Sequence, residues 1–378
     1  MAVRATGSDD VPATSLTAMT SPQPRPNVLA IPAYVAGKPP APRAGMTTYK
    51  LSSNENPYPP LPGVLDAAVA AAGQMNRYPD LGSAGLYDAL EARLGVPREH
   101  LALATGSVAL IYQLLQAFCE PGDEVVYAWR SFEAYPIAAA SAAATSVRVP
   151  VTADARHDLD AMLAAITDRT RLVLVCTPNN PTGPAVSQAD LDAFLDRVPA
   201  HVLVVVDEAY HEYADAFLAD YPSGLDYHKR GARSGLVVAR TFSKAYGLAG
   251  FRVGYAVATA PIAGALRAVS LPFGVSHVAQ AAALASLAAQ DAMLERVDAL
   301  VGERDLVLAG LRDAGWEVPD AQGNFVWFGV GDRAVDLAAA ADAAGIVVRP
   351  FAGDGVRASI GEPTANSRLL EVSRAFCL

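Results

Sequence analysis

The chain has 378 residues, of which 52% are hydrophobic and 18% are charged, and its formal net charge is −10. This length and apolar content predict two or three domains with a large packed core. The acidic balance argues against a nucleic-acid partner, because such a partner is normally bound by a basic face.

The three cysteines, Cys119, Cys176 and Cys377, are far apart in the sequence and include no C-x-x-C pair. Their spacing therefore predicts neither a disulfide framework nor a zinc site, and we expect no metal. Residues 1–25 lack the apolar stretch of a secretory signal, and no segment approaches the roughly 20 apolar residues of a membrane span. We therefore expect a cytoplasmic protein without a membrane partner.

Helical patterns begin after two N-terminal regions. Residues 1–27 are rich in Pro, Ser and Thr, a composition typical of a mobile tail. Residues 28–63 are expected to form an arm that joins the small domain.

Ser107 can cap a helix that Pro121-Gly122 ends. Helical spacing of apolar residues is found over residues 64–73, 83–94, 107–119, 158–166 and 188–198.

Short apolar runs separate these helices and are typical of strands buried on both faces of a sheet. They lie at residues 124–127, 171–176, 201–206, 235–239 and 253–256. Strands alternating with helices predict a mainly parallel central sheet in a large domain over residues 64–275. The remaining chain, residues 276–378, predicts a smaller α+β domain. Its signals are an Ala-rich helical stretch over 278–311, short strands at 324–328 and 346–349, and a C-terminal helix.

Four polar clusters adjoin these elements. Three follow strands: Thr-Pro-Asn-Asn-Pro-Thr-Gly at 177–183, Asp-Glu-Ala-Tyr at 207–210, and Arg-Thr-Phe-Ser-Lys at 240–244. The fourth, Thr105-Gly106, precedes the helix at Ser107. Each cluster alone is typical of a turn, a cap or a solvated loop. Four clusters at the same edge of one sheet predict a binding site.

The run Thr-Phe-Ser-Lys-Ala-Tyr-Gly-Leu-Ala-Gly-Phe-Arg at 241–252 resembles the lysine motif of fold-type I pyridoxal 5'-phosphate (PLP) aminotransferases. Asn-Pro-Thr-Gly at 180–183 and Asp-Glu-Ala-Tyr at 207–210 match two further signatures of that family, in the same order. The resemblance extends from Leu51 to about Gly361. It implies an α/β fold with a mainly parallel sheet in a large domain, a smaller α+β domain, and PLP as cofactor.

The resemblance also assigns roles around the PLP ring. Lys244 would hold the cofactor covalently and move a proton, roles that suit an amine of lowered pKa. Asp207 would face the pyridine nitrogen, which must stay protonated for the cofactor to act as an electron sink. Asn180 and Tyr210 would donate to the O3' oxygen. Phe132 would stack on the ring, although packing in the core is an alternative for this residue.

The phosphate group of PLP requires amides and a cation. By the resemblance, the amides of Gly106 and Ser107, the Ser243 hydroxyl and Arg252 supply them. Tyr78, in Asn-Arg-Tyr-Pro at 76–79, would reach the phosphate of the neighbouring subunit, so a homodimer is expected.

Four further residues are expected near the substrate. Asn56 lies in the segment 51–57, and Asn324 in Gln-Gly-Asn-Phe at 322–325. Arg357 would hold the substrate α-carboxylate in a bidentate pair, a geometry that Lys cannot reproduce. Arg349 is a second cation that either contacts a distal group or pairs with an acid.

Within the fold type, the chain resembles the histidinol-phosphate aminotransferase family, and especially its actinobacterial branch that acts on aromatic amino acids. Val108 and Ala109 stand where histidinol-phosphate enzymes have acidic or amide residues, and Trp-Arg-Ser-Phe-Glu at 129–133 replaces their Pro-Ser-Tyr segment. The more apolar wall suits an aromatic side chain.

The expected reaction is transamination of an aromatic L-amino acid with 2-oxoglutarate. The alternative is a histidinol-phosphate aminotransferase. A PLP-dependent decarboxylase or lyase is disfavoured by Arg357, which is placed to hold a carboxylate that transamination retains. A PLP-binding regulator is disfavoured because no DNA-binding module is attached.

Overall fold

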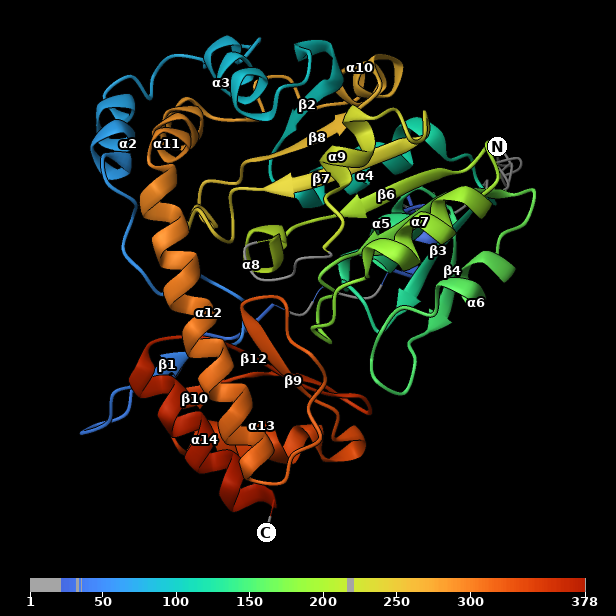
Figure 1. The fold of residues 1–378 in the computed structure, drawn as a ribbon. Coiled ribbons are helices and arrows are strands. Elements are labelled where there is room, and N and C mark those ends of the chain that lie inside the picture. Colours follow the sequence, from blue (N-terminus) through green and yellow to red (C-terminus); the bar gives the residue numbers. More distant parts are fainter. Residues whose placement is uncertain (1–21, 32–33, 35, 216–220, 378) are drawn as a thin grey trace, which may run out of the picture.

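The computed structural model describes residues 22–31, 34, 36–215 and 221–377. A seven-stranded sheet forms the centre of the larger part, in the order β2-β8-β7-β6-β5-β3-β4 (Figure 1). All strands except β8 run in the same direction. The strands are β2 (Leu101–Ala104), β3 (Glu124–Trp129), β4 (Thr145–Pro150), β5 (Thr170–Cys176), β6 (Leu203–Asp207), β7 (Leu236–Thr241) and β8 (Gly254–Ala258).

Both faces of this sheet are buried, which explains the continuous apolar runs in its central strands. Successive side chains of β6 point to opposite faces, so Val204 and Val206 belong to one core cluster and Val205 to the other. Helices α6 (Leu159–Ala164), α7 (Gln188–Arg197) and α9 (Gly224–Lys229) cover the first face. Helices α4 (Ser107–Phe118), α5 (Ala134–Ser141) and α10 (Ala260–Ala268) cover the second.

A 24-residue helix, α12 (Gln290–Asp313), links the two ends of the molecule (Figure 1). At one end, α11 (His277–Ala288) packs on α2 (Val64–Ala72) and α3 (Ala84–Leu94). At the other end, α12 packs on α14 (Pro363–Cys377) and on β9 (Phe325–Phe328) of the small sheet. The expected domain boundary near residue 275 therefore precedes α11, while α12 extends to the small sheet.

The small region contains two sheets. Strands β9, β11 (Arg349–Phe351) and β12 (Gly355–Ser359) form an antiparallel sheet in the order β11-β12-β9. Strand β1 (Tyr49–Lys50) pairs in parallel with β10 (Ile346–Val347), so a segment of the N-terminal arm adds to the C-terminal region. Helix α13 (Ala334–Ala343) packs on β10, β11 and β12. The remaining elements are α1 (Pro26–Leu29), η1 (Arg98–His100), α8 (His211–Asp215) and η2 (Gly331–Arg333).

The predicted helices and strands agree with the structure in place and type, with ends that differ by a few residues. The strands at the two edges of the large sheet, β2 and β4, had no prediction. The predicted tail over residues 1–27 lies mostly outside the described residues. Among the described residues, no helix combines the length and apolar character needed to cross a membrane.

Gly254, at the start of β8, lies against the N-terminus of α4 and offers a test of this packing. A Cβ atom at Gly254 would stand 2.5 Å from the Ser107 amide nitrogen and 2.7 Å from the Gly106 carbonyl carbon. We predict that Gly254→Ala destabilises the protein by about 1–3 kcal/mol through overpacking. The midpoint of urea unfolding, followed by circular dichroism, measures this effect.

Gly302, in the interior of α12, is the matched control because a Cβ atom there would meet nothing within 4 Å. Gly302→Ala should stabilise the protein by about 0.5–1 kcal/mol, since glycine is the poorer helix former. Equal unfolding midpoints for wild type and Gly254→Ala would contradict the close approach of β8 to α4.

Candidate active site

A cavity of about 280 Å³ lies beyond the carboxyl ends of β5, β6 and β7, where these strands meet the small region. This is the edge at which open α/β sheets bind ligands. The cavity brings together ten of the fourteen residues expected at the site: Ser107, Phe132, Asn180, Asp207, Tyr210, Ser243, Lys244, Arg252, Arg349 and Arg357.

The Lys244 side chain is half-buried, and its amine is held by backbone oxygens of the N-terminal arm. Its Nζ atom donates to the carbonyl oxygens of Asn54, at 3.1 Å, and Ser53, at 3.4 Å. Burial lowers the pKa of this amine to about 7, and the positive charge of Arg357 acts in the same direction. A large fraction of Lys244 is therefore uncharged at neutral pH, the form in which an amine is a nucleophile and can accept a proton.

The Asp207 carboxylate is buried at the end of β6 and uses only one of its oxygens in side-chain hydrogen bonding. Its Oδ2 atom accepts a hydrogen bond of 2.8 Å from the Tyr135 hydroxyl, whereas Oδ1 has no partner among the described residues. Burial raises the pKa of Asp207 to about 6, against the opposing effect of Tyr135. A bare carboxylate oxygen in such a place is costly unless a ligand donor meets it.

Two polar side chains border the same cavity. The Tyr210 hydroxyl accepts from Asn54 Nδ2 at 2.9 Å, and burial raises the pKa of Tyr210. Asn180 follows β5, and its Oδ1 atom accepts from Arg357 Nη1 at 2.6 Å. Asn180 and Arg357 thereby join the end of β5 in the large sheet to the middle of β12 in the small sheet.

An anion-binding corner is formed at the start of α4. Gly106 is the N-cap residue, at φ 86°, and Ser107 begins the helix with no side-chain capping bond, so the capping interpretation of Ser107 is wrong. A Cβ atom at Gly106 would stand 2.6 Å from Arg252 Nη2. Arg252 Nη1 donates to Ser243 Oγ at 3.2 Å. The Gly106 amide donates to the Ala104 carbonyl oxygen at 2.8 Å, so the amides at the start of α4 from Ser107 onward, with a hydroxyl and a guanidinium, are the groups that suit a phosphate.

Arg349 and Arg357 are directly opposite each other on β11 and β12. Arg357 Nη2 donates to the Ser52 carbonyl oxygen at 2.7 Å, and Arg357 Nε has no partner among the described residues. Arg349 Nη2 donates to Glu133 Oε2 at 2.7 Å. Arg349 therefore pairs with an acid and also lines the cavity, and its contact with a distal group of the substrate stays a prediction.

The other expected residues do not line the cavity. Asn56 Nδ2 donates to the Ala245 carbonyl oxygen at 3.1 Å and so contacts the backbone of the lysine loop. Asn324 Nδ2 donates to the carbonyl oxygens of Asn54 and Glu55, at 3.3 Å each. Gly106 donates its amide to the Ala104 carbonyl oxygen at 2.8 Å. Tyr78 is 82% exposed and stacks on Phe273, with ring centroids 4.7 Å apart.

Sequence reasoning missed Asn54 and Tyr135, which hold Tyr210 and Asp207 in place. Asn54 lies in the segment 51–57 that was singled out, but the resemblance pointed to Asn56 instead. Tyr135 is three residues after Phe132, whose ring it meets edge-on at 5.6 Å. Nothing local in the sequence marks Tyr135 as the partner of a carboxylate 72 positions away.

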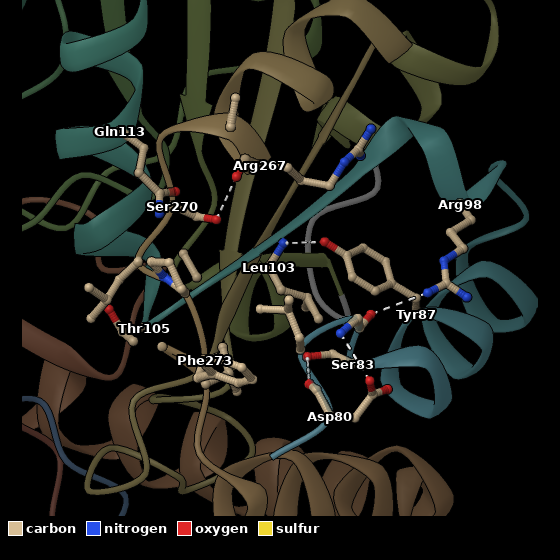
Figure 2. A pocket seen from close by; sticks show the side chains of 18 of the residues that line it. Asp80, Ser83, Tyr87, Arg98, Leu103, Thr105, Gln113, Arg267, Ser270 and Phe273 are labelled. Carbon is tan, nitrogen blue, oxygen red and sulfur yellow. Dashed lines mark hydrogen bonds between the residues drawn. The ribbon is translucent and has the colours of Figure 1, made fainter. Parts of the chain in front are cut away.

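A second cavity, larger than the first at about 720 Å³, lies elsewhere (Figure 2). Its wall includes Tyr87, whose hydroxyl accepts from the Leu103 amide at 3.1 Å, and Phe273. No lysine or histidine lines it, so it lacks the nucleophile that the smaller cavity has. The described residues also contain no group of three or more potential metal ligands. Chemistry, not volume, identifies the Lys244 cavity as the candidate active site.

Comparisons with known proteins agree with this geometry. Residues 47–371 match the family "Aminotransferase class I and II", and the chain belongs to it. Proteins named aromatic amino acid aminotransferase from Streptomyces avermitilis and Streptomyces coelicolor are 57% and 55% identical, each over 94% of this chain and 98% of the relative.

Two solved structures are also similar. Histidinol-phosphate aminotransferase from Sinorhizobium meliloti, in complex with pyridoxal-5'-phosphate, is 28% identical, with a TM-score of 0.81 over 96% of this chain and 99% of that one. Aspartate aminotransferase from Thermus thermophilus with maleate is 26% identical, with a TM-score of 0.78 over 88% and 92%.

The family is PLP-dependent, and the residues of the cavity fit this cofactor. The bare Asp207 Oδ1 matches a protonated ring nitrogen, and the corner at Ser107 and Arg252 matches a phosphate. Lys244 lines the same cavity and supplies an amine that would hold the aldehyde carbon.

The lowered pKa of Lys244 predicts its reactivity. In the cofactor-free protein, acylation of Lys244 by trace acetic anhydride should rise with pH through a midpoint near 7, because only the neutral amine reacts. Peptide mass spectrometry quantifies the labelling, with the exposed Lys229 as internal reference. A midpoint for Lys244 near the ordinary lysine value of about 10.4 would contradict the buried, cation-flanked amine.

Proposed function

We propose that this enzyme transfers the amino group of aromatic L-amino acids to 2-oxoglutarate. The observation that carries the proposal is a cavity that combines Lys244 and Arg357 with an apolar wall of Val108, Phe132 and Phe351. The names of the relatives that are 57% and 55% identical point to the same substrates. We also propose that the enzyme acts in the cytoplasm.

PLP would be held at four points of the cavity. Lys244 would bind it covalently, and Asp207 would pair with its ring nitrogen. Asn180 and Tyr210 would meet its O3' oxygen. The Ser107 amide at the start of α4, with Ser243 and Arg252, would bind its phosphate, and Phe132 would lie on the ring. When bound, the cofactor supplies an electron sink that lowers the barrier to removing the substrate α-proton.

The side chains of this chain would then divide the remaining work. Lys244 Nζ would accept the substrate α-proton and hold it for transfer, which its lowered pKa permits at neutral pH. Arg357 would orient the substrate through its α-carboxylate, and its unpartnered Nε is available for this contact. Asn324 and Asn56 would act without touching the substrate. Asn324 would fix the segment 54–56, and Asn56 would fix the loop that carries Lys244.

The alternative substrate is histidinol phosphate, and the observation that favours it is the adjacent pair of arginines, Arg349 and Arg357. Two cations could clamp a phosphate group. A phosphate dianion would have to displace Glu133 from Arg349, however, and the Val108 side chain offers it no further donor. A phosphate in this cavity would be desolvated and incompletely paired.

A substrate panel tests the preference. We predict that kcat/KM for phenylalanine exceeds that for histidinol phosphate by about ten- to a hundredfold, since an underpaired anion costs about 1–3 kcal/mol and 1.36 kcal/mol is tenfold. Glutamate formation from 2-oxoglutarate measures both rates with purified enzyme and PLP. A higher kcat/KM for histidinol phosphate would overturn the aromatic assignment.

We further propose a homodimer in which Tyr78 of each subunit completes the neighbouring site. Tyr78 does not line its own cavity, and it belongs to an exposed apolar surface with Leu81, Leu271 and Phe273, which are 64%, 72% and 38% exposed. An exposed apolar patch of this kind is typical of an interface between subunits.

Mixing two impaired variants tests the shared site. Lys244→Ala and Tyr78→Ala subunits should form hybrid dimers in which one site has both wild-type residues, so the mixture should be more active than either parent. Analytical ultracentrifugation should show a dimer. A fully active monomer, or a mixture no more active than its parents, would contradict the proposal.

A further inference from the structure

Two buried guanidinium groups stand side by side in the substrate end of the cavity. Arg349 and Arg357 are register partners on β11 and β12, and each is only 8% exposed. Their guanidinium carbons lie 5.3 Å and 5.9 Å from the centre of the Phe351 ring. Directly opposed like charges destabilise a sheet, so this pair requires a counter-charge.

Glu133 supplies that counter-charge from a different part of the fold. It precedes α5, next to Phe132, and reaches across to Arg349 with a hydrogen bond of 2.7 Å. Burial lowers the pKa of the Arg357 guanidinium, Arg349 lowers it further, and Glu133 raises it, so the three charges interact. Glu133 is partly accessible, with a side chain 28% exposed, whereas the Arg349 side chain is 9% exposed.

The other carboxylates of the cavity wall are engaged elsewhere. Asp207 is held by Tyr135, and Glu55 pairs with Lys50 at 2.9 Å. Two arginines and one glutamate leave a net charge of +1 at this end of the cavity. The single carboxylate of an aromatic amino acid neutralises that charge, and its uncharged ring leaves the Arg349–Glu133 pair intact.

We propose that Glu133 is a specificity-determining residue that sets the preference of the site between uncharged and anionic substrate side chains. Glu133 neutralises Arg349 while an aromatic ring occupies the cavity. An acidic co-substrate brings a second carboxylate, which takes the place of Glu133 on Arg349, and the partly exposed Glu133 turns toward solvent. This inference rests on the proposed function, because that function requires one cavity to accept both kinds of side chain.

The test measures binding of two unreactive probes to the PLP-loaded enzyme by calorimetry. 3-Phenylpropionate carries one carboxylate and a ring, and glutarate carries two carboxylates. Glu133→Gln leaves Arg349 without a counter-charge, so glutarate should bind about tenfold more tightly, while 3-phenylpropionate should bind equally or more weakly. The ratio of the two dissociation constants should therefore shift by about tenfold or more.

Two further variants separate charge from structure. The double variant Glu133→Gln/Arg349→Gln restores a net charge of +1 and should return the ratio toward the wild-type value. Asp354→Asn is the matched control, because Asp354 accepts from Arg130 Nε at 2.9 Å and joins the same two regions outside the cavity lining. Arg130 lies 5.3 Å from the centre of the same Phe351 ring but outside the cavity lining, so the ratio for this variant should shift much less than that for Glu133→Gln.

A role for Glu133 in structure alone predicts a different result, in which both probes weaken in parallel and the ratio stays constant. That result, or a double variant that keeps the shifted ratio, would overturn the inference. Failure of the proposed function is distinguishable, because it appears in the wild-type enzyme as a preference for histidinol phosphate over phenylalanine, whatever Glu133→Gln does to the two probes.

Discussion

The half-satisfied carboxylate of Asp207 is the constraint on which the rest of the site depends. Tyr135 holds one oxygen, and burial at the end of β6 keeps water from the other, so the folded chain carries a charge that only a ligand can complete. The other groups that line the cavity also fit the cofactor PLP. A large fraction of the Lys244 amine is uncharged at physiological pH, and the anion-binding corner lies at the start of α4. The buried Asp207 oxygen destabilises the folded chain while it has no donor, and a bound cofactor that donates to it would offset this effect.

At the substrate end of the cavity, the arrangement depends on a balance between positive and negative side chains. Arg357 is fixed by Asn180 and the Ser52 carbonyl, which come from the large sheet and the N-terminal arm. Arg349, opposite to it, is held by Glu133 from the loop before α5. Charged side chains from three separated segments therefore meet in one cavity. Their balance, rather than the volume of the cavity, is what distinguishes an uncharged ring from an anion.

The sequence predicts the features that depend on neighbouring residues, and it does not predict those that depend on contacts between distant segments. Continuous apolar runs such as that of β6 identify the central strands, and the polar clusters after them identify the edge that binds ligands. The edge strand β4, Thr-Ser-Val-Arg-Val-Pro, mixes polar and apolar residues and has no such signal. Asn54, Tyr135 and Glu133 were missed because each acts on a residue between 72 and 216 positions away. Only the folded chain brings these pairs together.

The central claim is that Lys244 is the amine that carries the cofactor, and covalent trapping tests it most directly. The chain has three other lysines, Lys38, Lys50 and Lys229. Borohydride reduction of the PLP-loaded enzyme, followed by peptide mass spectrometry, should place a single phosphopyridoxyl group on Lys244. The Lys244→Ala variant should bind the cofactor without forming that adduct. A reduced adduct on one of the other three lysines would contradict the account.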